Sequence, residues 1–378
     1  MFRQTPPMGW NSWNTFGANI NEQLIREMTD ALVSTGLRDA GYEYVIIDDA
    51  WQEPHRENGH LVPDRNKFPS GMKALGDYIH SKGMKFGMYS STGHLTCLGL
   101  PASYEHEFID AADFASWGVD YLKYDYCNRP FRIPSEMLYR RMGLALAGCG
   151  RDIFFAACSW GKDGTPEWIR GTGAGSWRST GDISDSWSAV RDLACAQHDK
   201  LLSGAINCFN DMDMLIVGMR GKGNVAVTGC TDDEYRTHFA LWSFMASPLI
   251  IGCDVRNIDE ESLKILKNKD IIRINQDPDG RLPLSLGGPA PYAFIGKNGY
   301  SLSRLLSDGS VAVGMFNMDD DTEISFQFSL YDVGLDKEHW GRTVLKELYT
   351  GEEIRPECGF VYAGVKPHCC KIWRLTVE

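Results

Sequence analysis

Short apolar runs recur along the first two thirds of the chain and are separated by longer amphipathic segments. The runs have the length and the β-branched or aromatic content of buried strands, and the segments between them repeat apolar positions at helical spacing. This alternation is typical of a parallel α/β fold. Eight strands are predicted, at Met8–Trp13, Tyr44–Asp48, Lys85–Ser90, Tyr121–Asp125, Ile153–Cys158, Ser176–Ser179, Ala205–Phe209 and Leu249–Cys253.

Helix signals occur in the segments between these strands. Asn21 stands where an N-cap is expected, and Thr165-Pro166 predicts a later N-cap followed by Pro at the first helical position. Eight strands fit a closed barrel better than an open doubly wound sheet, and no Gly-x-Gly-x-x-Gly follows the first strand. We therefore predict a (β/α)8 TIM barrel over residues 1–278. The first helix should bury one face, made of Leu24, Ile25, Met28, Ala31 and Leu32.

The pattern changes after residue 278, where alternating strand-like runs replace the helical ones. Turn residues separate these runs, and few helical patterns remain. We predict a C-terminal antiparallel β-sandwich domain over residues 279–378. Its strands include Ser310–Asn317, Glu323–Phe328 and Lys371–Val377, and its turns include Lys297-Asn298-Gly299, Ser307-Asp308-Gly309 and Tyr349-Thr350-Gly351.

Composition and charge exclude several classes of partner. The net charge is −12 with a pI of about 5.3, and no Lys/Arg cluster offers a footprint for nucleic acid. No apolar run approaches the roughly 18 residues of a spanning helix, so we expect no membrane partner. The N-terminus has no apolar signal region, so we expect a cytoplasmic protein, with a secreted mature form as the alternative. A homo-oligomer is compatible with this composition.

The cysteines do not form a recognisable framework. There are 11 of them, an odd number scattered through a large chain, and no Cys-x-x-Cys pair occurs. This distribution resembles neither a disulfide scaffold nor a zinc ribbon, so most of these residues are expected to be buried free thiols.

Polar side chains gather where the predicted strands end. Five strands end in carboxylates, aromatic rings or an arginine, and in a barrel these ends meet on one face. Such a cluster of acids needs a ligand, a metal or basic neighbours to offset its repulsion. The residues concerned are Asp48, Asp49, Tyr89, Asp125, Arg178, Asp182, Asp211 and Asp213.

Two chemistries use such a cluster, and the sequence favours one of them. A metal site would need histidines among the acids, and of the nine histidines only His94 lies near a predicted strand end. A glycosidase needs two carboxyl groups with opposite roles and an aromatic wall, for which Trp13, Trp51, Tyr89 and Trp160 are available. We therefore predict a glycosidase-like pocket without a metal.

Asp125 and Asp182 are the candidates for the two catalytic roles. Lys123 lies two residues before Asp125 on one strand face, so its cation should hold Asp125 ionised as a nucleophile; a purely structural ion pair is the alternative. Asp182 follows Ser179-Thr180-Gly181, where a different environment could raise its pKa and make it the general acid. A helix N-cap is the alternative role for Asp182.

Several motifs resemble those of glycoside hydrolase family 27, the α-galactosidase and α-N-acetylgalactosaminidase family, over nearly the whole chain. They are Thr5-Pro6-Pro7-Met8-Gly9-Trp10-Asn11-Ser12-Trp13, Ile47-Asp48-Asp49, Tyr121-Leu122-Lys123-Tyr124-Asp125-Tyr126-Cys127, Trp177-Arg178-Ser179-Thr180-Gly181-Asp182 and Asn210-Asp211-Met212-Asp213-Met214.

The resemblance implies a retaining exo-α-galactosidase that needs no metal and no cofactor. It implies that Asp125 is the nucleophile and Asp182 the acid/base. Asp48 and Asp49 match the pair that binds the 4- and 6-hydroxyls, and an intact pair favours a hexose over arabinopyranose. Other implied substrate-binding residues are Lys123 at the 3- and 4-hydroxyls, Arg178 and Asp213 at the 2- and 3-hydroxyl edge, Trp13, Tyr89 and Met214 as apolar walls, and Cys158 and Trp160.

One position leaves open whether the sugar is galactose or N-acetylgalactosamine. Members that accept N-acetylgalactosamine resemble this chain in having serine at Ser159, but they pair it with a small residue where Lys162 stands here. We therefore expect α-galactosides as substrates, with α-N-acetylgalactosaminidase activity as the alternative. A catalytically silent sugar-binding protein is a third reading.

The same resemblance implies one disulfide. Cys97 and Cys127 match a bridge that closes one side of the sugar pocket, although a reducing cytoplasm would work against it. Cys158 matches half of a second bridge, but its partner position is Ala174, so that bridge is not expected.

Overall fold

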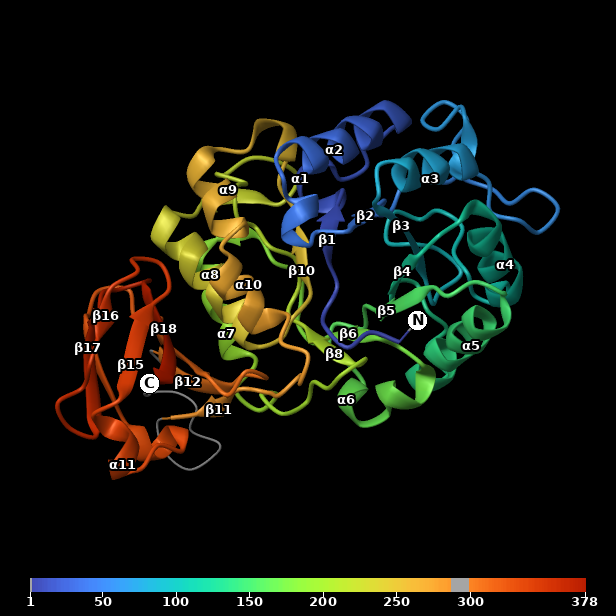
Figure 1. Cartoon of the computed structure of the whole chain (residues 1–378). Coiled ribbons are helices and arrows are strands. Elements are labelled where there is room, and N and C mark those ends of the chain that lie inside the picture. Colours follow the sequence, from blue (N-terminus) through green and yellow to red (C-terminus); the bar gives the residue numbers. More distant parts are fainter. Residues whose placement is uncertain (1, 287–298) are drawn as a thin grey trace.

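A computed structural model describes residues 2–286 and 299–378 and shows the two parts that the sequence predicts (Figure 1). The first part is a (β/α)8 barrel built on one sheet of eight parallel strands, in the order β10-β1-β2-β3-β4-β5-β6-β8. Their bounds are β1 Met8–Asn11, β2 Tyr44–Ile46, β3 Lys85–Ser91, β4 Tyr121–Asp125, β5 Phe154–Ala157, β6 Ser176–Arg178, β8 Phe209–Asp211 and β10 Leu249–Ile251.

The sheet closes through a residue that follows β8. The Leu215 N–H donates to the Ile250 carbonyl (2.7 Å), and the Gly252 N–H donates to the Leu215 carbonyl (2.9 Å). This bridge joins the segment after β8 to β10, so the eight strands enclose an interior. A separate buried cluster fills that interior and forms the floor of the barrel mouth: Tyr44, Ile46, Tyr121, Phe154, Ala156, Met214 and Ile250.

Each predicted strand overlaps an observed one, but the prediction for the seventh was wrong in its position. Ala205–Phe209 was predicted, whereas β8 begins at Phe209. Ala205 and Cys208 instead hydrogen-bond to each other through both backbone groups (3.1 and 3.0 Å), which closes a tight turn before the strand starts. Apolar content alone does not reveal that turn.

Helices surround the sheet, as each βα unit requires (Figure 1). The predicted cap is confirmed, since Asn21 Oδ1 accepts the Leu24 N–H (2.9 Å). The predicted cap at Thr165 is wrong by one residue, because Gly164, in the left-handed region (φ 65°), precedes the helix and Thr165 begins it. The helices are α1 Trp13–Phe16, α2 Glu22–Ser34, α3 Gly71–Ser81, α4 Glu107–Trp117, α5 Ser135–Gly148, α6 Thr165–Trp168, α7 Trp187–Cys195, α8 Asp232–Phe244, α9 Glu260–Leu266 and α10 Lys269–Asn275.

The C-terminal part is an antiparallel β-sandwich. One sheet has the order β11-β12-β13-β18-β15-β16, and β14 pairs with β17 in the other. A buried cluster lies between them and includes Val313, Phe326, Val361 and Trp373. The strands are β11 Leu284–Ser285, β12 Gly299–Leu305, β13 Val311–Asn317, β14 Ile324–Ser329, β15 Thr343–Glu347, β16 Glu353–Ile354, β17 Phe360–Val365 and β18 Cys370–Val377, with α11 at Lys337–Trp340.

Two of the three predicted turns lie where they were expected. Residues 307–309 join β12 to β13, and residues 348–350 separate β15 from β16. The prediction at Lys297-Asn298 lies outside the described residues. Gly309 has a φ of 81°, a backbone conformation that strongly favours glycine.

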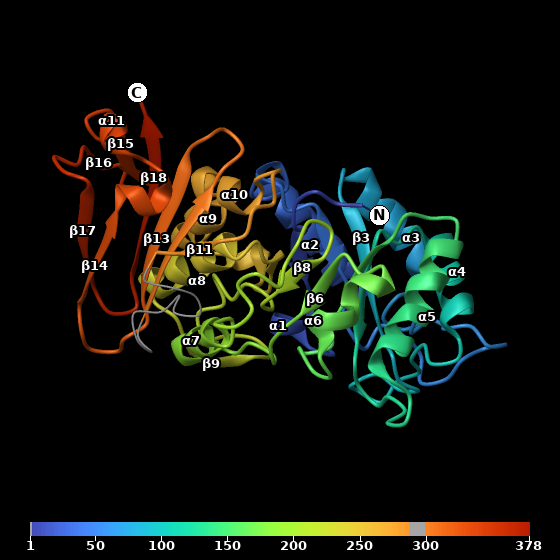
Figure 2. The same cartoon turned by 90° about the horizontal axis from the view of Figure 1, so that it is seen from below.

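The sandwich packs against the side of the barrel that carries α8, as both views show (Figures 1 and 2). Phe244 of α8 meets Phe316 of β13 edge to face, with ring centroids 5.6 Å apart. Buried side chains of both parts belong to one continuous core, which fixes the sandwich on the barrel away from the strand ends. No helix within residues 2–286 or 299–378 combines the length and apolar character needed to cross a membrane.

Candidate active site

A cavity of about 120 Å³ lies where the barrel strands end. It brings together 12 of the residues that the sequence predicted for a site, and Asn14 and Val225 complete its lining. Cys127, Cys158 and Ser159 do not line it. The predictions for Trp51 and Asp211 were also wrong. Trp51 is fully buried and its indole N–H donates to the Tyr89 carbonyl (2.9 Å), and Asp211 faces a smaller cavity inside the barrel. The 12 residues are Trp13, Asp48, Asp49, Tyr89, Cys97, Lys123, Asp125, Trp160, Arg178, Asp182, Asp213 and Met214.

Lys123 forms its ion pair with Asp48 rather than with its strand neighbour. Lys123 Nζ lies 2.7 Å from Asp48 Oδ2, which also accepts the Asn11 side-chain amide (2.7 Å). The pKa of Lys123 is raised: burial lowers it, but the surrounding anions, Asp48 first, outweigh burial. The ammonium is therefore a fixed positive charge beside the acids.

Asp49 is held by backbone donors. Asp49 Oδ1 accepts the Ala50 N–H (2.8 Å), and Oδ2 accepts the Leu98 N–H (3.0 Å). Burial still raises the pKa of this carboxyl, because these hydrogen bonds offset the loss of water only in part. Asp48 and Asp49 thus present two buried carboxyl groups at the end of β2.

Asp125 is the most enclosed acid of the proposed pair. Its Oδ2 accepts the Tyr89 hydroxyl (3.1 Å), and its Oδ1 accepts the Tyr126 N–H (2.8 Å). Burial raises the pKa of Asp125 to about 6, while the Lys123 cation pulls it down. Asp125 is consequently ionised above about pH 6, and the Lys123 cation offsets the effect of burial only in part.

Asp182 lies in a different environment, and the prediction of a raised pKa was wrong for this structure. Its side chain is 73% exposed, and its Oδ1 is 2.6 Å from the Arg178 guanidinium. Partial burial raises the pKa of Asp182, but the Arg178 and Lys123 cations outweigh burial and lower it. The same guanidinium also pairs with Asp213 (2.8 Å), so Arg178 bridges the two acids.

The structure also excludes the helix-cap role for Asp182. Helix α7 begins at Trp187, and its N-cap is Ser186, whose hydroxyl accepts the Ala189 N–H (3.3 Å). Asp182 therefore lies in the β6 loop and faces the cavity without a capping role.

Sequence reasoning missed Asn14 and Val225. Asn14 directly follows Trp13, the last residue of the first motif, so its position beside the motif was the available signal. Val225 reaches the cavity because its N–H bonds the Asn14 carbonyl (3.1 Å), a contact between segments more than 200 residues apart. No local sequence pattern predicts a contact between such distant segments.

Cys127, Cys158 and Ser159 were predicted to bind the sugar but lie outside the lining. Cys127 is bonded to Cys97 in a disulfide with a Cα–Cα distance of 5.2 Å. Cys158 is a buried free thiol near Arg178 (3.7 Å), and Ala174, which stands at the position of the missing partner cysteine, is buried too. Ser159 is fully buried, and its hydroxyl lies 2.8 Å from that of Thr165.

Among the described residues, one group of three has metal-ligand spacing: Cys97, Asp125 and Cys127. Both sulfurs are shared in the disulfide, so they offer no thiolate to a metal. His94 packs its ring on Tyr104 (4.5 Å) instead of joining the acids. These donors do not fit a metal centre.

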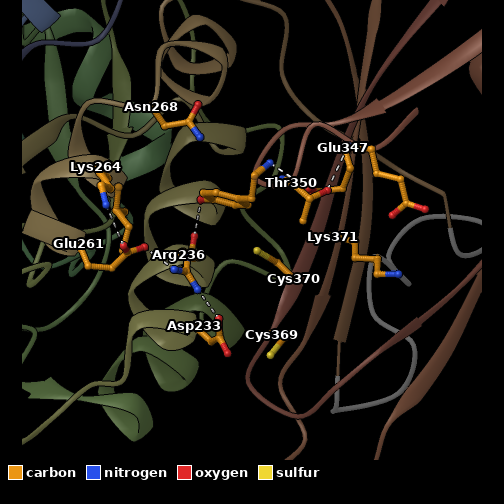
Figure 3. A pocket seen from close by; sticks show the side chains of 13 residues that line it. Asp233, Arg236, Glu261, Lys264, Asn268, Glu347, Thr350, Cys369, Cys370 and Lys371 are labelled. Atoms are coloured by element: carbon orange, nitrogen blue, oxygen red, sulfur yellow. Dashed lines mark hydrogen bonds and ion pairs between the residues drawn. The ribbon is translucent and has the colours of Figure 1, made fainter. Parts of the chain in front are cut away.

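A larger cavity of about 510 Å³ lies between the barrel helices and the sandwich (Figure 3). Several of its charged groups have partners within the cavity: Arg236 pairs with Asp233 (2.6 Å) and Glu261, and Glu347 accepts the Thr350 N–H (2.5 Å). Tyr349 is the only ring among the described residues that line the cavity, which therefore lacks an aromatic wall, so we interpret it as a crevice at the domain junction.

The barrel and its mouth define a glycoside hydrolase, with two carboxyl groups of contrasting environment in one sugar-sized cavity beside aromatic and apolar walls. The model of the family described as "Alpha galactosidase A" matches residues 5–277, and that of the "Alpha galactosidase C-terminal beta sandwich domain" matches residues 301–375. The chain belongs to the α-galactosidase family of glycoside hydrolases.

Relatives and solved structures agree with this membership. An α-galactosidase from Coffea arabica is 49% identical over 380 residues, covering 99% of this chain and 94% of its own. One from Cyamopsis tetragonoloba is 42% identical over 382 residues, covering 99% and 86%. The crystal structure of α-galactosidase I from Mortierella vinacea superposes with a TM-score of 0.87 at 32% identity, covering 100% and 98%.

Proposed function

We propose that the protein is a retaining exo-α-galactosidase that removes terminal α-linked galactose by double displacement. The observation that carries this proposal is the placement of Asp125 and Asp182 in one cavity of about 120 Å³, with contrasting burial and electrostatics. Two such carboxyl groups are what glycoside hydrolysis requires.

Asp125 suits the nucleophile. Two hydrogen bonds from Tyr89 and Tyr126 fix the direction of its oxygens, which limits the entropy lost on reaching the anomeric carbon. It attacks that carbon, the glycosidic bond breaks, and a covalent galactosyl–enzyme intermediate forms. Water then hydrolyses the intermediate.

Asp182 suits the general acid and then the base. In the empty site water reaches most of its side chain. A bound substrate would cover this carboxyl, because the acid must touch the leaving oxygen, and the loss of water would raise its pKa. Substrate hydroxyls that bond Arg178 would weaken its ion pair with Asp182, and this would also raise the pKa of Asp182. The binding of substrate would thus raise the pKa of Asp182 into the range that a general acid needs.

The remaining charges suit galactose hydroxyls. By the family resemblance, Asp48, Asp49 and Lys123 would bind the 3-, 4- and 6-hydroxyls, and Arg178 and Asp213 the 2- and 3-hydroxyl edge. The relatives named α-galactosidase support this sugar. The Saccharomyces cerevisiae α-galactosidase, 28% identical to this chain, has been solved with raffinose, an α-galactoside.

Galactose is favoured over N-acetylgalactosamine by the burial of Ser159. This hydroxyl bonds Thr165 and does not line the cavity, so it is not available to an acetamido group. Purified protein should hydrolyse 4-nitrophenyl α-galactoside much faster than the 2-acetamido analogue. A faster acetamido reaction would reverse the assignment, and no turnover of either would leave a silent sugar-binding protein.

The proposed mechanism is tested by replacing the nucleophile. Asp125→Ala should abolish hydrolysis while the far-ultraviolet circular dichroism stays that of the parent. Added azide should restore turnover of a substrate with a good leaving group and should give β-galactosyl azide, because azide attacks from the face that the carboxylate occupied. Activity without azide, or an α-configured azide product, would exclude Asp125 as the nucleophile.

A further inference from the structure

Two loops build one side of the cavity mouth. The loop after β4 covers residues 126–134, and the loop after β5 covers residues 158–164. Trp160 of the second loop lines the cavity, and its ring meets that of Tyr126 edge to face at 6.0 Å. The two loops therefore form one continuous rim, and Tyr126 connects this rim to Asp125, the preceding residue.

Rings and a cation continue outward from this contact. The Arg129 guanidinium lies 4.5 Å from the Tyr126 ring centroid and 5.6 Å from that of Phe131. The Phe131 side chain is 89% exposed, more than any other large apolar residue in the described part of the chain. A row of Trp160, Tyr126, Arg129 and Phe131 thus runs from the cavity into solvent.

The row is held in place by a network of one half-exposed acid, two hydroxyls and the guanidinium. Asp163 Oδ2 accepts hydrogen bonds from Ser135 (2.6 Å) and Tyr126, and it pairs with Arg129 at 3.1 Å. The ion pair fixes the guanidinium and offsets its charge, and a guanidinium has more N–H donors than this pair uses. A rigid surface loses little entropy on binding.

The row also lies on the side from which a leaving group would depart. The Gly161 N–H donates to the Arg178 carbonyl (2.8 Å), so the Trp160 loop rests on the end of β6, four residues before Asp182. A general acid must reach the glycosidic oxygen. The sugar attached through that oxygen must therefore leave the cavity beside this loop.

We propose that Arg129 and Phe131 form a subsite for the sugar units to which galactose is attached. The ligand class is a neutral oligosaccharide with galactose α-linked to further pyranoses, whose apolar C–H faces would lie on the Phe131 ring and whose hydroxyls would accept from Arg129. This assignment rests on the proposed α-galactosidase function and goes beyond it by naming the two residues that contact the leaving-group sugar.

The test compares two substrates that share the α-galactosyl group and differ in the leaving group. α-Galactosyl fluoride has no sugar in the leaving position, whereas raffinose carries two further sugar units. Phe131→Ala should lower kcat/KM for raffinose about three- to tenfold, the size of a lost aromatic contact, mainly through a higher KM. The same variant should leave hydrolysis of the fluoride unchanged, and Phe131→Trp should keep the raffinose rate.

The matched control is Phe360→Ala, which removes another exposed phenylalanine, on β17 of the sandwich. It should change neither substrate. Equal rates of raffinose hydrolysis for Phe131→Ala and the parent, or an equal loss on both substrates, would overturn the subsite. If the parent hydrolysed neither substrate, the proposed function itself would fail, so the two failures are distinguishable.

Discussion

The charge of Lys123 should set the lower pH limit of activity. Lys123 faces into the barrel with Asp125, and its cation opposes the effect of burial, which raises the pKa of Asp125 to about 6. Lys123→Met keeps the length of the side chain and removes the charge. A nearby opposite charge lowers a carboxyl pKa by about one to three units. Removing the Lys123 charge should therefore raise the pKa of Asp125 well above 6.

The assay is kcat/KM for α-galactosyl fluoride between pH 4 and 9. Fluoride needs little protonation on leaving, so the acidic limb reports the ionisation of the nucleophile in the free enzyme. In the parent this limb should fall near pH 6. In Lys123→Met it should move upward by about one pH unit or more. The height of the profile should also fall, because a sugar-binding group is lost.

The same substitution should destabilise the fold. Lys123 Nζ is 2.7 Å from Asp48, and leaving one partner of a buried pair alone costs about 3–5 kcal/mol of unfolding free energy. The double variant Lys123→Met/Asp48→Asn removes both charges, so it should unfold at a higher temperature than the single variant.

Lys73→Met is the control, since it removes an exposed lysine of α3 that pairs with Asp77. It should leave the pH profile in place. If the acidic limb of Lys123→Met stayed near pH 6 while the variant remained folded, the electrostatic reasoning would be refuted.

Three further predictions follow from the same site. Asp125→Asn should stabilise the protein at pH 7 by up to about 3 kcal/mol, because a carboxyl whose pKa is raised to about 6 loses stability as the pH rises from about 4 to 6; thermal melts at pH 7 and 4 should show the gain only at pH 7. Asp182→Ala should slow raffinose about 10²- to 10⁴-fold and the fluoride far less, and equal losses would deny it the role of acid. Reduction of Cys97–Cys127, which are 30 residues apart, should cost about 3 kcal/mol of unfolding free energy, and a Cys97→Ala/Cys127→Ala variant should melt at the same temperature with and without reductant.

Much of the fold was predictable because its signals are local. A buried strand needs a short apolar run and a helix needs a periodic face, and both patterns can be read without knowledge of neighbours. The eight strands, the helix capped by Asn21 and the change to antiparallel strands in the C-terminal part were found in this way. The position of β8 was not, because a turn between Ala205 and Cys208 displaces it.

The candidate site divides in the same way. Strand alternation places Lys123 and Asp125 on one face, and parallel strands bring their ends together, so the sequence determined which acids would meet. The sequence did not determine which ion pairs form within the cluster, or which acids have a raised or lowered pKa. Arg178 reaches both Asp182 and Asp213 because β6 and β8 are neighbours in the sheet, and that ion-pair geometry lowers the pKa of the acid that was expected to have a raised one.

Only the tertiary structure placed the remaining residues of the site. Ser159 is turned away from the sugar by its bond to Thr165, and Val225 reaches the cavity through a contact with Asn14. Phe131 joins the rim only because Arg129 is held between Tyr126 and the distant Asp163. The amino-acid sequence decides which side chains stand at the strand ends. Their burial, their ion pairs and the shape of the rim depend on which distant segments meet in space.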